Sequence, residues 1–423
     1  MFFFFFFDDD FKSVYATCEN HTSLSDTKSY NIGEWSEIYA MLKLAADGKL
    51  VSANNIDLET DDTSSEITVL DVIRFDQGKR RDYLISKDGS LEINLYSDSK
   101  YEKSIPQAHF EQASEYLYDA LKQYVDYKAP KGEKKDKGIK RTDLTFLDNF
   151  LAAINVEKIK QDSVHKADIQ LGIHDTFTGQ DKEVGYSVKS FIGAKPTLIN
   201  SSGETRFKYE LVGITEYDMN QVNAIDGRGS QIIDVQLKDG SIVKVSGKIK
   251  ARFRKLQDIV EDFRFSHLNT EYSDNLQLLD FLMPDIVAKM LLYKFTKGEN
   301  DVAKLTNMLA EDNPYNFHNS KAYEYKVKQM LYAHALGMKP GKVWDGYEEA
   351  NGGYIIVKKE GGLVAFFLYD KNLFEKYLFE KTFLETPDPS KKKFDYGYVY
   401  AENGKFYIDL VLQVRFYDQD FVK

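Results

Sequence analysis

The chain has 423 residues, which suggests two or three domains or one large elaborated domain. The hydrophobic fraction of 43% and the charged fraction of 29% are those of a globular protein, so wholesale disorder is excluded. The formal net charge of −11 argues against a protein that coats nucleic acid with its whole surface. It remains compatible with basic residues concentrated in one cleft.

A single cysteine, Cys18, excludes an intramolecular disulfide and a cysteine-based zinc site, so we expect a cytoplasmic protein. No stretch approaches the roughly 20 apolar residues that cross a bilayer. Residues 2–7 are all phenylalanine, have no basic residue ahead of them and are short for the core of a signal peptide. We predict that residues 1–28 form a tail that is poorly ordered at its start.

Residues 31–49 have a helical pattern. Asn31 and Glu34 have the spacing of a capping box, and Gly48 is a suitable stop. Glu37 falls one turn from Glu34 on the same side of the helix. From this stretch alone, the simplest explanation of both acids is a favourable interaction with the helix dipole.

The next segments alternate apolar runs with polar turns. We predict a hairpin over residues 83–95, with Asp88 and Gly89 at the turn, and a helix over residues 108–127. Residues 128–141, rich in lysine and glycine, are typical of a solvated loop.

Residues 165–192 have the pattern of a strand hairpin with one apolar face. In its first strand, Ala167, Ile169, Leu171 and Ile173 alternate with Asp168 and other polar residues. In the second strand, Val184, Tyr186 and Val188 alternate with Glu183, Ser187 and Lys189. The pairing register can therefore bring Asp168 and Lys189 onto the same polar face.

Residues 231–246 predict another hairpin, which turns at Asp239 and Gly240. It leads into the densest basic stretch of the chain, which runs from Lys244 to Lys255 without an acid. The later segments predict helices at 275–296, 301–337 and 373–381, strands at 353–357 and 363–369, and a final hairpin turning at 403–404.

An aspartate and a lysine on neighbouring strands suit metal-assisted phosphodiester hydrolysis. A carboxylate holds Mg²⁺ through hard oxygen ligands, and a lysine neutralises charge that develops on the phosphate. Glu37 could supply a second acidic ligand. From the residues alone, a surface ion pair of small energetic value explains Asp168 and Lys189 more simply.

Several motifs, in order along the chain, resemble the HpaII restriction endonuclease family. Collinear agreement over most of the chain is more specific than any one of them. The motifs lie at residues 33–37 with 47–49, 165–170, 185–190, 195–200, 344–346, 349–357, 385–387 and 412–416.

The resemblance implies a type II restriction endonuclease that cuts double-stranded DNA with Mg²⁺. It implies an α/β fold with a PD-(D/E)XK-like core, in which helices flank a mixed sheet. Asp168 would be the first metal ligand, Ser187 and Lys189 would hold the E-x-K positions, and Glu37 would be the acid of the first core helix and a second ligand. Ser187 departs from the pattern because an acid usually stands there, and we expect Glu37, ahead of Glu183, to supply the missing charge.

If the family's specificity extends to this chain, the target is the palindrome CCGG. A palindrome suggests a homodimer. Because the enzyme would cut an unprotected host genome, we also expect a cognate DNA cytosine methyltransferase as a functional partner. Guanine is best read by Arg or Lys. The candidate DNA-binding residues are Lys195, Arg206, Lys248, Lys250, Arg252 and Arg254.

Two alternatives stay open. Ser187 is also consistent with a catalytically impaired, sequence-specific DNA-binding protein, and the same fold could cut a different or modified sequence. For domains, we expect a nuclease core at residues 29–270 with an insertion at about 51–144. Residues 271–423 would form a C-terminal α/β region that assists DNA binding.

Overall fold

The computed structural model describes residues 28–61, 64–129, 136–161, 167–175, 179–387 and 396–421. Residues 1–27 of the tail predicted at 1–28, the centre of the lysine-rich loop and the lysines at 391–393 lie outside these ranges. Within them, no helix is long and apolar enough to cross a membrane. The α/β class predicted from the sequence is confirmed.

The described chain divides into two compact units. The first contains residues 1–196, 348–374 and 418–423, and the second contains residues 197–347 and 375–417. The division after Pro196 differs from the expected boundary at 270. Residues 197–270 pack with the later helices because their apolar side chains share a core with them.

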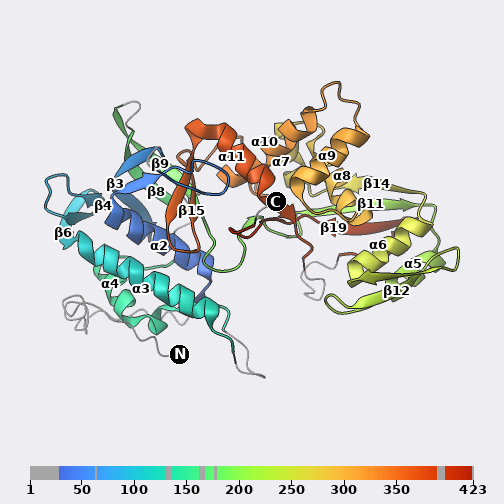
Figure 1. The fold of residues 1–423 in the computed structure, drawn as a ribbon, viewed down its shortest axis with the longest axis horizontal. Helices are drawn as coiled ribbons and strands as arrows, with labels where there is room; N and C mark the ends of the chain where they lie inside the picture. Colours follow the sequence, from blue (N-terminus) through green and yellow to red (C-terminus); the bar gives the residue numbers. More distant parts are fainter. Residues whose placement is uncertain are drawn as a thin grey trace. The chain divides into compact units, whose positions relative to one another are not determined.

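A nine-stranded mixed sheet organises the first unit (Figure 1), in the order β16-β15-β9-β8-β3-β4-β5-β6 with β2 paired to β3. All neighbours are antiparallel except β15 and β9. The strands are β2 (Lys49–Val51), β3 (Glu66–Asp76), β4 (Lys79–Ile85), β5 (Glu92–Ser97), β6 (Lys100–Pro106), β8 (Ile169–Asp175), β9 (Gln180–Ser190), β15 (Gly353–Val357) and β16 (Leu363–Phe367).

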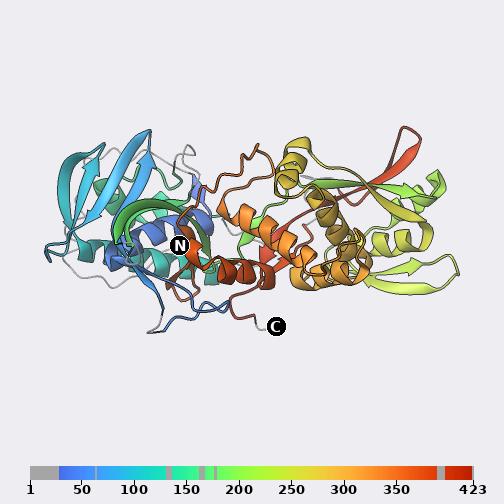
Figure 2. The same cartoon turned by 90° about the horizontal axis from the view of Figure 1, so that it is seen from above.

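The region predicted as an insertion, about 51–144, supplies strands β3 to β6 of this sheet. Strand β3 pairs directly with β8, so β3 to β6, drawn in blue and cyan in Figure 2, extend the sheet to one edge. Sequence reasoning missed the pairing because about 100 residues separate the two strands.

Helix α2 (Ile32–Asp47) packs between the sheet and α3 (Gln107–Asp126). The predicted capping box is present: the Asn31 side chain accepts from Glu34 N at 3.1 Å, and the Glu34 carboxylate accepts from Asn31 N at 2.9 Å. Gly48 ends the helix with φ 65°, in the left-handed region that favours glycine. The shared core includes Leu42 and Leu171.

Three small elements complete the first unit. Strands β1 (Ser29–Tyr30) and β7 (Ile139–Lys140) pair, and α4 (Thr145–Ala153) packs against α3.

The second unit has a four-stranded sheet (β14-β11-β19-β18), a three-stranded sheet (β10-β20-β17) and a separate hairpin, β12–β13. Its strands are β10 (Thr197–Ile199), β11 (Arg206–Val212), β12 (Ile232–Gln236), β13 (Ile242–Ser246), β14 (Asp262–His267), β17 (Thr382–Leu384), β18 (Val399–Glu402), β19 (Lys405–Val411) and β20 (Val414–Phe416). Its helices are α5 (Glu216–Ala224), α6 (Lys248–Ile259), α7 (Thr270–Leu279), α8 (Met283–Thr296), α9 (Val302–Asp312) and α10 (Ala322–Leu336).

The two long helices predicted in this unit are each divided into two. Asp280 ends α7, and Pro284 begins the first turn of α8, where its missing N–H costs nothing. Asn313 ends α9 with φ 40°. The predicted helix at 373–381 is α11 (Lys371–Glu380), and the final hairpin turns at Asn403 and Gly404 as expected.

Candidate active site

The β8–β9 hairpin places Asp168 beside Ser187. Strand β8 pairs with β9 so that Ile169 faces Tyr186, which brings Asp168, one residue earlier, alongside Ser187. The backbone continues this pairing because Asp168 N donates to Tyr186 O at 3.0 Å. The apolar face predicted for both strands is buried, so the polar side chains share the opposite face.

The Asp168 carboxylate is held from one side by β9. Its Oδ2 accepts hydrogen bonds from Val188 N at 2.8 Å and from Ser187 Oγ at 2.9 Å. The Lys189 ammonium lies 3.9 Å from the same oxygen. Lys189 Nζ also donates to Val188 O at 3.2 Å and lies 3.5 Å from Ser187 Oγ. The three residues therefore form one connected polar group.

A residue that sequence reasoning missed positions the Asp168 backbone. Gln161 donates from Nε2 to Asp168 O at 3.1 Å, and its Oε1 accepts from Phe75 N on β3 at 3.2 Å. The side chain thus ties the start of β8 to the neighbouring strand. No pattern in the sequence could have shown this, because Gln161 belongs to no regular element.

Glu37, on α2, interacts electrostatically with this group. Burial and the negative charge of Asp168 together raise the pKa of the Glu37 carboxyl from 4.5 to about 8, against the opposing effect of the Lys189 ammonium. Glu37 therefore lies within electrostatic reach of both residues. Helix α2 shares a core with β8 and β9, which brings a residue 131 positions earlier in the chain than Asp168 into the same part of the first unit.

The structure distinguishes between the two acids considered as replacements at position 187. Glu183 accepts two hydrogen bonds from Arg80, at 2.6 and 3.0 Å, in an exposed ion pair. Its carboxylate is thus engaged with Arg80, whereas the charge of Asp168 acts on Glu37. Ser187 itself donates to Asp168 and so orients the carboxylate that stands beside it.

The residues of the site fit a divalent cation. Glu37 and Asp168 offer the hard oxygen donors that Mg²⁺ prefers. The negative charge of Asp168 raises the pKa of Glu37, and a bound cation would offset this repulsion between the two carboxylates. Among the described residues, no group of three or more His, Cys, Asp or Glu side chains could hold a metal. Two carboxylates, with the remaining positions left to water and phosphate oxygens, suit Mg²⁺.

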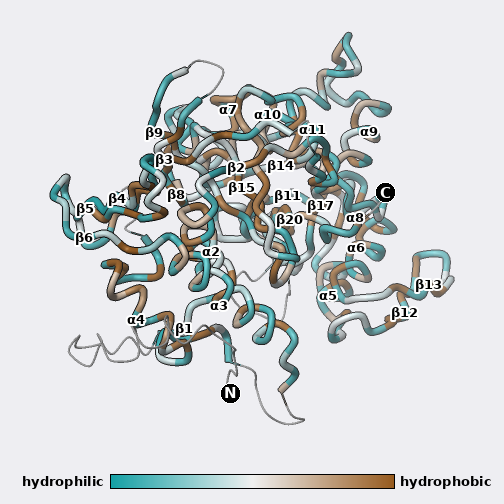
Figure 3. The backbone as a smooth tube through the Cα atoms, turned by 60° about the vertical axis from the view of Figure 1, so that its left-hand side comes forward, coloured by the Kyte–Doolittle hydropathy of each residue, from teal (hydrophilic) through white to brown (hydrophobic). Residues whose placement is uncertain are grey.

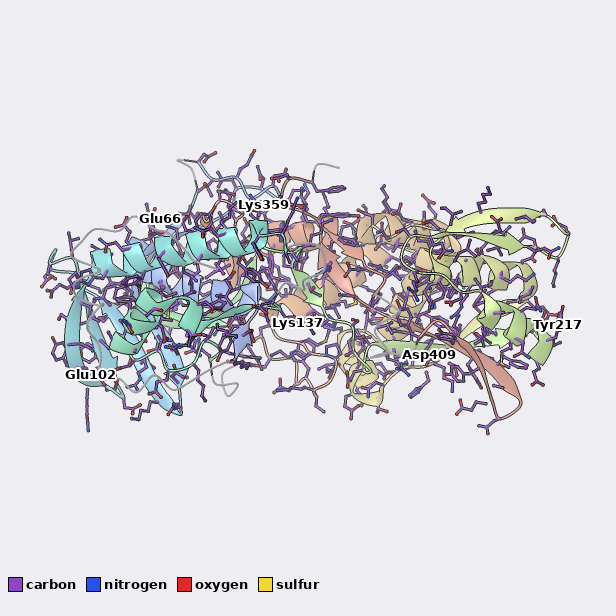
Figure 4. All side chains as sticks on the ribbon, turned by 90° about the horizontal axis from the view of Figure 1, so that it is seen from below. Glu66, Glu102, Lys137, Tyr217, Lys359 and Asp409 are labelled. Atoms are coloured by element: carbon purple, nitrogen blue, oxygen red, sulfur yellow. The ribbon has the colours of Figure 1, made fainter. Side chains whose placement is uncertain are left out.

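The predicted DNA-binding residues have different environments. Lys195 and Lys250 are exposed, and Arg254 is half-buried. Lys248 pairs with Asp226 at 3.1 Å. Arg206 lies 3.6 Å from Asp409, a residue of β19 that Figure 4 labels.

Arg252 has an environment unlike that of the other predicted DNA-binding residues. Only 1% of this residue is exposed, and its guanidinium donates to the carbonyls of Ile225, Asn223 and Gly397. It also lies over the ring of Tyr398, 3.9 Å from the centroid. Arg252 is thus buried inside the second unit, with three of its five N–H donors bonded to backbone carbonyls, which argues against a contact with DNA.

The model of the HpaII restriction endonuclease family matches residues 31–416. The chain belongs to the HpaII restriction endonuclease family. A relative from Haemophilus parainfluenzae, "Type II restriction enzyme HpaII", is 30% identical over 391 residues, which cover 92% of this chain and 98% of that protein. No solved structure matches. This member of the HpaII family is a type II site-specific deoxyribonuclease, and the match spans both compact units.

Proposed function

We propose that this enzyme hydrolyses phosphodiester bonds of double-stranded DNA with Mg²⁺, through Asp168, Glu37, Ser187 and Lys189 in a PD-(D/E)XK-like core. The observation that carries the proposal is the Asp168 carboxylate, which Ser187 and Val188 N hold beside the Lys189 ammonium while Glu37 faces it. Type II restriction endonucleases generally use Mg²⁺. Asp168 and Glu37 would hold the cation, which supplies charge stabilisation and an acidified water.

The residues around the cation have separate tasks. Ser187 and Val188 N fix one oxygen of Asp168, which leaves the other without a hydrogen bond among the described residues. Lys189 provides a positive charge next to that carboxylate, where it can neutralise charge that develops on the phosphate or orient the attacking water. Ser187 is a positioning residue and need not replace an acidic ligand.

The test is cleavage of unmethylated plasmid DNA in Mg²⁺ by the wild type, Asp168→Ala and a control, Glu183→Gln. We expect discrete fragments from the wild type and the control, and a rate at least about 10²–10³-fold lower for Asp168→Ala. Glu183 is a suitable control because it lies on β9 but pairs with Arg80. The catalytic assignment fails if Asp168→Ala cuts as fast as the wild type.

We further propose that the target is CCGG, that a homodimer reads the palindrome, and that a cytosine methyltransferase protects the host genome. The support is family membership together with the two-fold symmetry of such a site. Run-off sequencing of the cleavage products identifies the target, and ultracentrifugation with a site duplex gives the stoichiometry. Sequence-dependent binding in EDTA without cleavage in any divalent metal would instead indicate a DNA-binding protein that has lost catalysis.

A further inference from the structure

The β12–β13 hairpin has one buried face and one exposed face. Its inner face packs on α6 through an apolar cluster that includes Val235 and Ala251. The outer face is exposed along its whole length. In Figure 3 the turn of the hairpin protrudes beyond α5 and α6. The six outer residues are Ile232, Asp234, Gln236, Ile242, Lys244 and Ser246.

Two features of the outer face are unusual for a surface that meets only water. Ile232 and Ile242 are 59% and 63% exposed. Asp234 lies directly opposite Lys244 in the strand register, yet in the described part of the chain neither side chain forms an ion pair or a hydrogen bond. A donor and an acceptor thus stand side by side with their bonding capacity unused.

The hairpin is mounted rigidly on the second unit. Lys255 Nζ donates to Gln236 O at 2.7 Å, and the Asp258 carboxylate accepts from Lys238 N at 2.6 Å. Arg252 anchors α6 below it through three backbone carbonyls. Rigid support of this kind is what recognition of base edges requires.

The local charge complements DNA. Residues 226–255 contain eight Lys and Arg against three Asp, in a chain whose net charge is −11. A cavity of about 400 Å³ adjoins the base of the hairpin, with Ser230, Ser246, Lys248 and Lys250 among its lining residues. Ser246 belongs to both the outer face and the cavity, so one bound molecule could reach both.

We propose that the outer face of β12–β13 enters the major groove of the DNA substrate and reads a C·G pair through Asp234 and Lys244. A two-stranded ribbon fits the major groove. There, cytosine presents the N4 amino donor, which a carboxylate accepts, and guanine presents O6 and N7, which an ammonium contacts. The opposed aspartate and lysine match this pair of edges, and Lys250 at the adjoining cavity contacts a phosphate.

This inference rests on the proposed function, since it assumes that DNA containing C·G pairs is the substrate. The two can fail separately, because reading bases affects discrimination between sequences whereas Asp168 affects cleavage. Binding is therefore measured by fluorescence anisotropy in EDTA on full-length protein. The probes are a 24-bp duplex with the site that wild-type cleavage identifies and a duplex of the same composition with that site scrambled.

The variants are Lys244→Gln, Lys244→Arg and, as a control of equal charge change, Lys103→Gln on the exposed edge strand β6 of the first unit. We expect Lys244→Gln to weaken binding to the site duplex by about 10- to 100-fold and to change binding to the scrambled duplex by less than about 3-fold. Lys244→Arg should retain the discrimination, because arginine also contacts guanine. Asp234→Asn should reduce discrimination at the same base pair.

Equal weakening of Lys244→Gln on both duplexes would show a phosphate contact and overturn base reading. If Lys244→Gln discriminates between the two duplexes as well as the wild type does, this inference is overturned. The proposed function stays intact in that case, provided that Asp168→Ala has lost cleavage. If the wild type neither binds nor cuts either duplex, both fail. Lys244 is exposed and has no partner among the described residues, so an unchanged Tm for Lys244→Gln confirms that the variant folds.

Discussion

The hairpins β8–β9 and β12–β13 have the same local design and different surroundings. Each has an apolar inner face and places an aspartate and a lysine on its outer face. In β8–β9, Asp168 and Lys189 lie inside a nine-stranded sheet, next to a helix that brings Glu37, and they interact with each other. In β12–β13, Asp234 and Lys244 stand on an isolated ribbon and interact with nothing described.

The difference teaches that neighbouring elements, rather than the hairpin sequence, decide what an Asp–Lys pair does. Partial burial with a second carboxylate creates an electrostatic environment suited to a cation. Exposure on a ribbon leaves donor and acceptor available to a macromolecule. The four predictions below test this contrast, from the largest expected effect to the smallest.

Replacing the lysine of the first hairpin should abolish its chemistry. We expect Lys189→Met to lower the rate of plasmid cleavage by about 10²–10³-fold, because the positive charge next to Asp168 is lost. The control is Lys182→Met, also on β9, where the lysine forms only a long 4.0 Å pair with Asp175. Loss of activity in both variants would mean that the charge of the strand, rather than the site, is responsible.

The packing of the β12–β13 hairpin on the second unit should depend on Arg252, which anchors α6. We expect Arg252→Met to lower the free energy of unfolding by about 2–4 kcal/mol, because one buried and two partly buried carbonyls lose their donor. Arg254→Met, two residues along the same helix, should cost less than about 1 kcal/mol. Urea denaturation measures both, and equal costs would contradict the anchoring role.

Acid should destabilise the second unit through His334. Its Nδ1 lies 2.8 Å from Met330 O and its Nε2 lies 3.1 Å from Tyr272 Oη, and burial lowers its pKa from 6.5 to about 4. A depressed histidine pKa means that the neutral form stabilises the fold. The stability is complete above pH 6.5 and declines as the pH falls towards 4, by about 3 kcal/mol in total.

Thermal unfolding between pH 4 and pH 7 measures this decline. His334→Gln, which cannot gain a proton, should flatten the pH dependence. An unchanged slope in that variant would assign the decline to other groups.

Removing the hydroxyl of Ser187 should have the smallest effect. Asp168 keeps its bond from Val188 N, so we expect Ser187→Ala to slow cleavage by only about 2- to 10-fold, the value of one hydrogen bond. Single-turnover cleavage at saturating protein measures the chemical step. A loss as large as that of Asp168→Ala would show that the hydroxyl does more than position the carboxylate.

Much of the site could be predicted because it is local. The two-residue alternation of β8 and β9 put Asp168, Ser187 and Lys189 on one face, and the capping box of α2 located the helix that carries Glu37. The approach of Glu37 to Asp168 came from the family resemblance, since the residues themselves do not determine which helix packs on which strand.

The features that the sequence did not predict all depend on contacts between residues far apart in the chain. Gln161 bridges Asp168 to β3, and Arg252 binds the carbonyl of Gly397, 145 residues away. A basic run such as Lys244 to Lys255 looks uniform in the sequence. The structure divides it into Lys244 and Lys250, which are exposed, and Lys248, Arg252 and Lys255, whose charged groups have partners inside the protein.

The sequence by itself therefore determined the α/β class, the hairpins, both ends of α2 and the polar face of the β8–β9 hairpin, because strand alternation and capping are set by neighbours in the chain. Only the tertiary structure decided the division after Pro196, the union of β3 with β8, and the contrast between an engaged Asp168 and an open Asp234. These depend on which apolar faces pack together, and burial is shared by residues far apart in the chain.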